Sequence, residues 1–539
     1  MSEFFYRTEE IRLEEISDYF VETKQDRQII NQLKAVNPIV LVGSRGMGKS
    51  FLFRMAQKEL LGNFEQDKIL PVYLTFRKSS LIQTSNQAQF HLWMMARLCN
   101  EILRALRNNG GITSTPASLA ILAGGTQPST LSLKTKIEEI ADLFESSWQE
   151  PGVEVDTSGI PTIDHFLDAI EDICLATSIR RLVIFIDEAA HVLWPEQQRQ
   201  FFTLFRDLRS PYITCNAAVY PGVTVYGDTF QPIHDATILS LHRDVQDSSY
   251  VSAMRDIVSK QATGDSTLIR NIIQRGQNFS ILAYAASGNP RHLLKTVMQA
   301  PGLRGDEVNS VIREYYRNDV WAEHSGLALK YTGHREIIDW GRKFVEIEVL
   351  PELNKKNSQY LSEDKKTTCY FWMHRDIPQA IKEALRLLEY TGIVFEHASG
   401  IRATRAEIGT RYSTNLGCLM ALEATPTSTG FEIAKSITPK RMTEYGINYR
   451  FYETLLEAMP TFTEPDMSTM LKQLLSKDIE VLDLTPWQRE KLQSINIYTV
   501  GEILKASEGK LQEAHYIGEK KARRIRNAAV TAVYEYLSG

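Results

Sequence analysis

The octet from Gly43 to Ser50 constrains this 539-residue chain more than any other feature of its sequence. It reads Gly-Ser-Arg-Gly-Met-Gly-Lys-Ser and fits the pattern G-x-x-x-x-G-K-[ST] at every position. Glycines let the backbone curve closely around an anion, so that the amide N–H groups point inward. In such a loop Lys49 reaches the β- and γ-phosphates of a nucleotide, and the Ser50 hydroxyl binds Mg²⁺. The octet therefore predicts a site for nucleotide phosphates.

The sequence around the octet has the strand, loop and helix order that the pattern requires. Residues 38–42, Pro-Ile-Val-Leu-Val, are a short apolar run that is typical of a buried parallel strand. A helical pattern begins at Phe51, directly after the loop. The residues that we expect to contact the nucleotide are Gly43, Ser44, Arg45, Gly46, Met47, Gly48, Lys49, Ser50 and Phe51.

The composition limits the cellular compartment and the partners that we expect for this protein. It has 61 Lys and Arg against 66 Asp and Glu, so any nucleic-acid binding must be local. Its five cysteines are scattered without a C-x-x-C pair, which favours a reducing cytoplasm and argues against structural zinc. The N-terminus lacks the pattern of a secretion signal, and no apolar run is long enough to span a bilayer. We therefore expect a cytoplasmic protein with no membrane partner.

A second apolar run ends in two carboxylates. Residues 182–186 are Leu-Val-Ile-Phe-Ile, and Asp187 and Glu188 follow them directly. A buried parallel strand brings the side chains at its carboxyl end to the edge where α/β sheets build their sites. Asp187 is therefore a candidate for the Mg²⁺ shell, and Glu188 is a candidate for the general base that polarises the attacking water. With the octet, the pair predicts a parallel α/β sheet that binds ATP and Mg²⁺ and hydrolyses ATP.

The segment from Tyr212 to Tyr220 predicts the next strand along the chain. In ATPases with a catalytic glutamate, a polar side chain on this strand senses the γ-phosphate. Asn216 and Tyr220 are the alternatives for that sensor here. A purely structural role for both residues is the competing interpretation.

Three arginines are further catalytic candidates. Pro290 suits the first turn of a helix, so Arg291 leaves a helix N-terminus at a fixed angle. Its guanidinium is predicted to bridge to the γ-phosphate from a small helical lid, and the alternative is a solvated arginine on a surface helix. Arg206 and Arg209 lie at the end of a predicted helix. Either is a candidate arginine finger across a subunit interface, and a solvated helix face is the alternative.

Together these motifs resemble the AAA+ P-loop ATPases of the replication-initiator, origin-recognition type. The resemblance rests on Gly43–Ser50, on Ile184–Glu188, on the polar strand after them, and on Gly288–Arg291. It implies a parallel sheet with a helical lid and a winged-helix domain, with ATP and Mg²⁺ bound. It also implies a homo-oligomer. The chain is similar, too, to bacterial ATPases of this kind that are associated with defence against phage.

The segment from 378 to 404 follows the order of a winged helix. A helix is predicted over 378–390 and a strand over 392–396. A turn at Ala398-Ser399-Gly400 and a return strand over 401–404 complete the expected hairpin. Arg402 and Arg405, near this wing, are candidates for contacts with DNA phosphates. A protein-docking module is the alternative.

The tail carries a third pattern. Leu484-Thr485-Pro486-Trp487 begins a helix, and the runs 495–504 and 516–525 follow it. This tail resembles the helix-hairpin-helix domain at the C-terminus of the bacterial RNA polymerase α subunit. Such hairpins hold a DNA phosphate on backbone N–H groups, although here Tyr516 replaces the first glycine of the usual G-x-G turn. The candidate DNA-binding residues are Gly518, Lys520, Lys521, Arg523 and Arg524. A structural or partner-binding hairpin is the alternative.

The predicted segments are an ATPase core over 1–240, a helical lid over 241–325, a winged helix over 326–425, a linker or helical segment over 426–480 and a helix-hairpin-helix domain over 481–539. The predicted function is an ATP-hydrolysing switch that oligomerises and binds DNA. One alternative is an ATP-driven scaffold of an antiviral defence or signalling complex that recruits a separate effector protein. A transposition-regulator-type ATPase is the other.

Overall fold

The chain divides into two compact units, and each is described by itself. The first unit comprises Met1–Glu59, Ala218–Thr224 and Thr237–Thr463, and the second comprises Leu60–Ala217, Val225–Ala236 and Glu464–Gly539. The structure is a computed structural model that describes residues 4–76, 88–109, 117–125, 134–147, 155–189, 195–330, 334–404, 406–456, 475–482, 484–519, 521–526 and 528–529.

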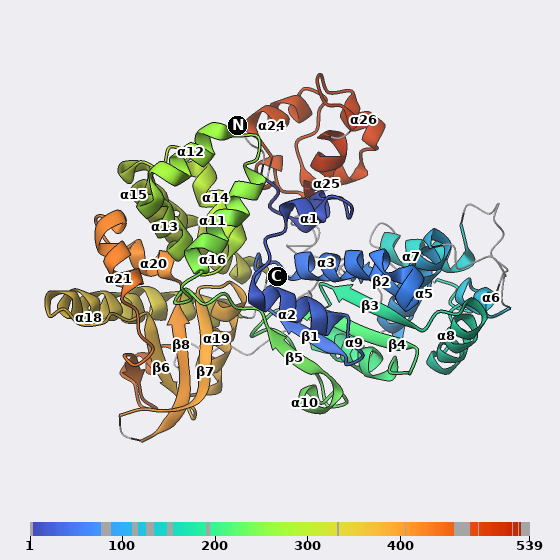
Figure 1. The fold of residues 1–539 in the computed structure, drawn as a ribbon, viewed down its shortest axis with the longest axis horizontal. Coiled ribbons are helices and arrows are strands. Elements are labelled where there is room, and N and C mark those ends of the chain that lie inside the picture. Colours follow the sequence, from blue (N-terminus) through green and yellow to red (C-terminus); the bar gives the residue numbers. More distant parts are fainter. Residues whose placement is uncertain are drawn as a thin grey trace. The chain divides into compact units, whose positions relative to one another are not determined.

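Five strands form a sheet with the order β2-β3-β4-β1-β5 (Figure 1). The strands are β1 (Ile39–Val42), β2 (Ile69–Thr75), β3 (Arg181–Asp187), β4 (Ile213–Val219) and β5 (Thr237–Ser240). The pairs β2–β3, β3–β4 and β1–β5 all run parallel. Every residue of β3 is buried, which explains its unbroken apolar run. The predicted α/β class is confirmed.

In the first unit, helices precede and follow the short strands. Helix α2 (Lys24–Leu33) lies before β1, and α3 (Lys49–Gly62) begins inside the octet. The segment predicted as a helical lid is helical, because its apolar residues recur at helical spacing and are buried. Its helices are α11 (Tyr250–Gln261), α12 (Ser266–Gln274), α13 (Gly276–Ala285), α14 (Pro290–Gln299) and α15 (Gly305–Glu314).

In the second unit, helices precede and separate the strands. They are α5 (Ala88–Asn108), α6 (Ser118–Leu122), α7 (Lys136–Ser146), α8 (Ile163–Thr177) and α9 (Pro195–Asp207). Helices α7 and α8 each begin at a threonine whose side chain accepts a backbone N–H of the first turn. Among the described residues of the whole chain, no helix is both long and apolar enough to cross a membrane.

The region of the first unit that is predicted as a winged helix, called the winged-helix region below, has a four-stranded sheet in the order β7-β8-β6-β9. Its strands are β6 (Tyr370–His374), β7 (Val394–Arg402), β8 (Ile408–Thr414) and β9 (Thr443–Tyr445), and helix α19 (Gln379–Tyr390) precedes the β7–β8 hairpin. The predicted helix is confirmed. The predicted turn at Ala398-Ser399-Gly400 is wrong, because β7 continues through it. Irregularities in the β7–β8 ladder, with Gly400 at a φ of 69°, absorb these residues. The predicted return strand is wrong as well, since Arg402 still belongs to β7.

Residues 426–456, predicted as a linker or helical segment, add structure to this region. They form η6 (Pro426–Gly430), α21 (Phe431–Lys435), strand β9 and η7 (Arg450–Tyr452). Strand β9 pairs in parallel with β6, and Tyr445 and Tyr452 are buried. These aromatic residues anchor a stretch whose Ser, Thr and Pro content suggested a linker. The predicted domain boundaries themselves stay a prediction.

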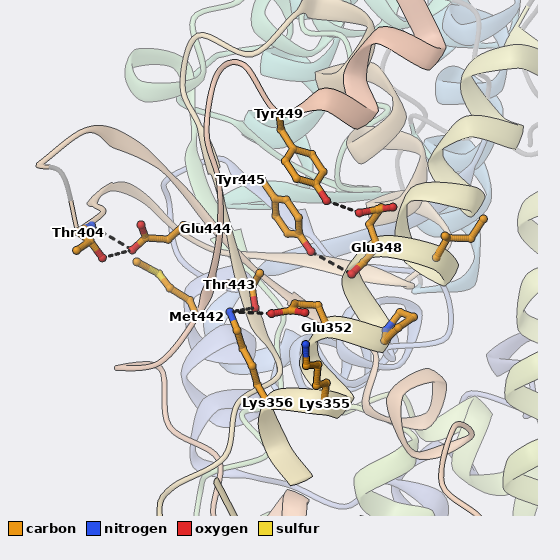
Figure 2. A pocket seen from close by; sticks show the side chains of 12 residues that line it. Glu348, Glu352, Lys355, Lys356, Thr404, Met442, Thr443, Glu444, Tyr445 and Tyr449 are labelled. Carbon is orange, nitrogen blue, oxygen red and sulfur yellow. Dashed lines mark hydrogen bonds and ion pairs between the residues drawn. The ribbon is translucent and has the colours of Figure 1, made fainter. Parts of the chain in front are cut away.

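A cavity of about 640 Å³ lies between this stretch and helix α18 (Leu350–Ser362), as Figure 2 shows. Several of its charged groups find partners within its own wall. Lys356 Nζ lies 3.0 Å from Thr443 Oγ1 and 3.5 Å from Glu352 Oε1. The hydroxyls of Tyr445 and Tyr449 both donate to Glu348. Because most of these polar groups contact one another, we assign no ligand to the cavity.

The tail forms a small helical module of the second unit. Its helices include α24 (Pro486–Gln493), α25 (Val500–Lys505) and α26 (Glu508–Gln512), and residues 521–526 are helical too. Each of the three named helices begins at a Thr or Ser cap. The apolar core includes Leu492, Val500, Ile503, Leu511, Ile517, Ala522 and Ile525.

Candidate nucleotide-binding site

The octet forms the loop between β1 and α3, as the sequence predicts. Gly43 N–H donates to the carbonyl of Val219 at 3.2 Å, which ties the start of the loop to the end of β4. Gly46 and Gly48 have φ values of 81° and 101°, which favour glycine. A Cβ at Gly46 would lie 2.6 Å from Asn289 Oδ1, whereas a Cβ at Gly48 would meet only Arg243 Nη2 within 4 Å, at 3.7 Å. The loop is therefore packed at Gly46 and open at Gly48.

Lys49 is folded back onto the loop. Its side chain is 8% exposed, and its Nζ donates to the carbonyl oxygens of Gly43 and Ser44 at 2.5 and 3.2 Å. The same ammonium lies 4.0 Å from the centroid of the Tyr220 ring. Carbonyl oxygens and an aromatic face thus hold the cation where the motif predicts a phosphate-binding group.

The lid contacts the loop through Asn289. Asn289 Nδ2 donates to the carbonyl of Arg45 at 2.8 Å, and Asn289 Oδ1 accepts from the backbone N–H groups of Arg291 and His292. One side chain therefore caps α14 and binds the loop. The structure places Arg291 beside Gly46, but its Nε donates to the carbonyl of Tyr6 at 3.2 Å. A contact of Arg291 with the γ-phosphate stays a prediction.

Arg243, just after β5, is a loop contact that the sequence reasoning missed. Its Nη1 donates to the carbonyl of Met47 at 2.5 Å, and its Nη2 lies 3.5 Å from Asp26 Oδ1, a carboxylate that is 1% exposed. Arg243 Nε is buried and has no hydrogen-bond partner among the described residues. The only sequence signal was a basic residue shortly after a short, mostly apolar run, which is too common to single it out.

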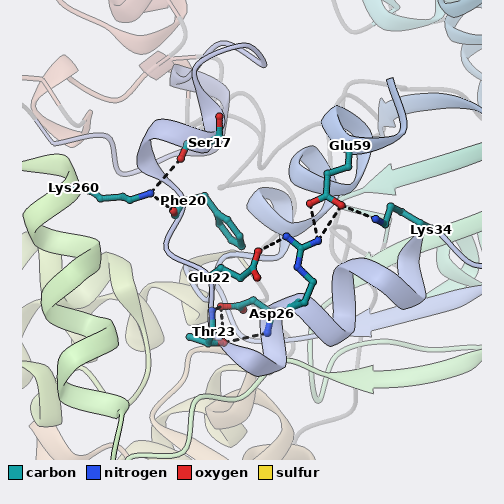
Figure 3. A network of polar contacts seen from close by, with 9 residues as sticks. Ser17, Phe20, Glu22, Thr23, Asp26, Lys34, Glu59 and Lys260 are labelled. Carbon is teal, nitrogen blue, oxygen red and sulfur yellow. Dashed lines mark hydrogen bonds and ion pairs between the residues drawn. The ribbon is translucent and has the colours of Figure 1, made fainter. Parts of the chain in front are cut away.

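Helix α3, which begins at Lys49, is fixed by an ion-pair network with α2 (Figure 3). Glu59 of α3 lies 2.8 Å from Arg27 Nη1 and 2.6 Å from Lys34 Nζ. Burial raises the pKa of Glu59, but the hydrogen bonds from Lys34 and Arg27 outweigh it and hold that pKa below its usual value. Thr23 and Asp26 form a capping box at the start of α2. Asp26 thereby links the α2 cap to Arg243 and the loop.

The two predicted carboxylates lie at the carboxyl end of β3 in the second unit. Asp187 is buried, and its Oδ2 accepts from the hydroxyl of Tyr73 at 2.6 Å. Thr75 Oγ1 lies 3.4 Å from Glu188 Oε2. Glu188 has a φ of 56°, which is uncommon for a residue with a side chain. The predicted position at a strand end is confirmed, and the predicted roles in Mg²⁺ binding and water activation stay predictions.

The other catalytic candidates lie in different surroundings. Asn216 is fully buried within β4, and Tyr220, just after that strand, contacts Lys49. Arg206 Nε contacts Asp207 Oδ1 at 2.8 Å and its Nη1 contacts the Thr229 carbonyl at 2.9 Å. Arg209 Nη2 donates to the carbonyl of Asp235 at 3.1 Å. Both arginines are partly exposed and have partners within the chain, so the arginine finger stays a prediction.

The predicted DNA-binding residues of the tail lie around an exposed turn. Tyr516 is 74% exposed with a φ of 69°, so it adopts the left-handed conformation that a glycine usually supplies there. Lys521 Nζ lies 4.5 Å from the centroid of the Trp487 ring, and Arg523 pairs with Glu519 at 2.8 Å. Arg524 is half-buried, and nothing would contact a Cβ at Gly518.

Two further DNA candidates, Lys520 and Arg405, lie outside the described residues. Arg402, at the end of β7, is exposed. The described candidates thus occupy two places in the chain, the β7–β8 hairpin of the first unit and the C-terminal turn of the second. The structure gives each of them a position, and their contacts with DNA stay a prediction.

Comparison with known proteins finds a similarity in the N-terminal part of the chain. Residues 4–262 match the ORC-CDC6-like family model. No curated protein matches the chain. Among solved structures, that of the Aeropyrum pernix ORC1 protein in complex with DNA is similar at 13% identity, over 76% of this chain and 94% of that chain, with a TM-score of 0.29. The phosphate-binding loop and the five-stranded parallel sheet both lie in the segment that is similar to the ORC-CDC6-like family.

Proposed function

We propose that this protein binds and hydrolyses ATP at the Gly43–Ser50 loop and that the nucleotide controls DNA binding by its winged-helix and C-terminal modules. The observation that carries the nucleotide part is the buried Lys49 ammonium within a loop that has two glycines at positive φ. Phosphate oxygens carry full charge and bind an ammonium more strongly than carbonyl oxygens or an aromatic ring do. A nucleotide therefore displaces the partners that Lys49 has now.

The loop residues fit a phosphate chain. The backbone at Gly48 is open except for Arg243 Nη2. Arg243 adds a guanidinium beside the loop, and its buried Nε still needs an acceptor. A phosphate oxygen supplies that acceptor. We therefore add Arg243 to the residues that bind the nucleotide.

The chain's own groups then have the following roles. Lys49 binds the β- and γ-phosphates, and Ser50 and Asp187 hold Mg²⁺. When bound, Mg²⁺ neutralises charge on the phosphates. Glu188 accepts the proton of the attacking water, and Arg291 leaves the Tyr6 carbonyl to bind the γ-phosphate from the lid. In a homo-oligomer, Arg206 or Arg209 of a second copy completes the site, and Asn216 supports β4 from within.

DNA binding is proposed for the two surfaces that carry the candidate arginines and lysines. In the tail, Lys521 and Arg523 are exposed around the turn that contains Gly518, and Arg524 is half-buried. Arg402 is exposed at the tip of the β7–β8 hairpin. Such side chains bind backbone phosphates and position a module without reading the base sequence. The scaffold and transposition-regulator alternatives stay predictions.

The nucleotide part is tested by titrating a fluorescent ATP analogue and by measuring phosphate release. We expect Lys49→Ala to abolish binding and Glu188→Gln to leave binding intact while phosphate release stops. Lys68→Ala is the matched control, because Lys68 is a surface lysine that pairs with Glu65. Normal hydrolysis by Glu188→Gln would contradict the assignment of the general base.

A further inference from the structure

The Tyr220 ring lies between the phosphate-binding loop and helix α19 of the winged-helix region. Tyr220 is buried, and Lys49 Nζ lies 4.0 Å from its ring centroid. The ring of Tyr390, the last residue of α19, packs edge-on against it, with 5.5 Å between centroids and an interplanar angle of 87°. An ammonium and two tyrosine rings thus form a continuous row of contacts from the loop to α19.

Two further contacts hold the same end of α19 at the site. Ser44 Oγ of the loop lies 3.5 Å from the carbonyl oxygen of Glu389. Arg386 Nε donates to the carbonyl of Gly222, two residues after Tyr220. A Cβ at Gly222 would lie 2.2 Å from the carbonyl oxygen of Arg386, so only glycine permits this approach. The loop and the segment after β4 therefore both contact the last turn of α19.

The row of contacts depends on where Lys49 is. Its ammonium attracts the face of the Tyr220 ring only while it lies close to that face, and a phosphate that draws Lys49 away weakens this contact. When Lys49 moves to a phosphate, Tyr220 loses its cation. Its contact with Tyr390 then loses the partner that orients it. This order of contacts is the route by which occupancy of the loop would reach α19.

We propose that Tyr220 is a positioning residue that couples nucleotide binding at the loop to helix α19, so that ATP loosens the last turn of α19 and frees it for binding. The proposal rests on nucleotide binding at Gly43–Ser50. In a winged helix, the helix before the hairpin is the one that approaches DNA, and α19 directly precedes the β7–β8 hairpin. The coupling is reciprocal, because any change that α19 makes in ATP affinity equals the change that ATP makes in α19 docking.

The test is amide hydrogen exchange of the full chain with and without a non-hydrolysable ATP analogue and Mg²⁺. In the wild type, we expect the analogue to increase exchange in residues 386–394. Tyr220→Leu removes the ring, so exchange in α19 should already be high without the analogue and should not change when the analogue is added. Tyr220→Phe keeps the ring face and should respond as the wild type does. Tyr449→Leu is the matched control, since Tyr449 contacts Glu348 away from α19, and it should respond normally.

A second readout covers the case in which Tyr220→Leu loosens α19 merely by damaging the core. Without the ring, Lys49 gives up no cation–π contact when it binds a phosphate. We therefore expect Tyr220→Leu to bind the analogue about tenfold tighter and Tyr220→Phe to bind it as the wild type does. General damage would weaken binding instead and would overturn the proposal. An unchanged α19 in a wild-type chain that does bind the analogue would also overturn it. Failure of the wild type to bind at all would instead remove the proposed function.

Discussion

The phosphate-binding loop and the C-terminal turn are both predicted to bind phosphates, yet they are built in opposite ways. In the loop, Lys49 is buried and its partners are groups of the protein itself. At the C-terminal turn, Tyr516 is exposed and the surroundings of Gly518 are open. A ligand at the loop must replace internal contacts, so we expect its binding to be transmitted. A ligand at the turn adds to a surface, so its effect stays local and depends on salt.

The largest difference between the two regions is expected when one glycine in each is replaced by alanine. Gly46→Ala places a Cβ at positive φ and 2.6 Å from Asn289 Oδ1, so we expect loss of nucleotide binding and destabilisation by ~2–4 kcal/mol. Gly518→Ala enters open space and should change stability by less than ~0.5 kcal/mol. Urea unfolding and nucleotide titration measure both effects. Equal effects of the two substitutions would remove the structural contrast.

A smaller effect is expected for the side chain that joins the lid to the loop. Asn289→Ala loses the cap of α14 and the bond to the Arg45 carbonyl, so we expect ~1 kcal/mol less stability and about tenfold weaker ATP binding. Asp265→Ala removes a cap from α12 in the same lid and is the matched control. It should lose similar stability and keep its ATP affinity. Thermal unfolding and titration together would show whether the loop contact matters.

A carboxylate near each region should make the protein respond oppositely to pH: Glu389 of α19, whose carbonyl contacts Ser44 of the loop, and Glu502 of α25 in the tail. Burial, together with the nearby Glu396 carboxylate, raises the pKa of Glu389 to about 8, and this outweighs the favourable charge of Arg386. The raised pKa means that its stabilising contribution is complete below its unfolded value of 4.5 and is lost as pH rises towards 8. Glu389→Gln should therefore stabilise the protein most at pH 8 and little at pH 5, as measured by thermal unfolding. Tyr412 also lies near this carboxylate and should keep its neutral form throughout.

In the tail, the sign is reversed. The backbone N–H groups of Tyr498 and Thr499 donate to Glu502 and lower its pKa. Its contribution is present above its unfolded value of 4.5 and is lost as pH falls. Glu502→Gln should therefore reduce stability at pH 7 and have less effect at pH 4. A tail that became more stable as pH fell would contradict this.

The smallest expected effect is at the exposed cations of the tail. Lys521→Ala with Arg523→Ala should weaken DNA binding about 5-fold to 30-fold and flatten its salt dependence, because two phosphate contacts are lost. ATP binding should not change. Lys510→Ala is the control, since Lys510 lies in the same module and pairs with Glu513. An unchanged salt slope in a titration of labelled duplex would place the DNA contacts elsewhere.

The features that were predictable from the sequence are local ones. The octet specifies its own loop, and the run before Asp187 specifies a buried strand with a carboxylate at its end. The contact of Arg243 with the loop and the contact of Tyr220 with Tyr390 were not predictable, because each joins segments that are far apart in the chain. The turn assigned to Ala398-Ser399-Gly400 failed for a related reason, since pairing with β8 decides whether these residues turn or bulge.

The residue types at the site were thus easier to predict than their partners. The phosphate-binding role that we propose for Lys49 was predicted from the motif, but its position on the Tyr220 ring depends on how β4 ends. The lid motif located Asn289 and Arg291, yet it pointed to the arginine, whereas Asn289 makes the contact with the loop. The motif alone does not distinguish Asn289 from Arg291. Tertiary packing determines that Asn289 is the residue that contacts the loop.

The central claim is that nucleotide binding at the loop controls DNA binding elsewhere in the chain. The most direct test measures the affinity of the full chain for a labelled duplex of random sequence, at one fixed salt concentration, with and without a non-hydrolysable ATP analogue and Mg²⁺. We predict that the analogue tightens DNA binding by about tenfold in the wild type and has no effect in Lys49→Ala. The same DNA affinity with and without the analogue, in a wild-type chain shown to bind it, would contradict the claim.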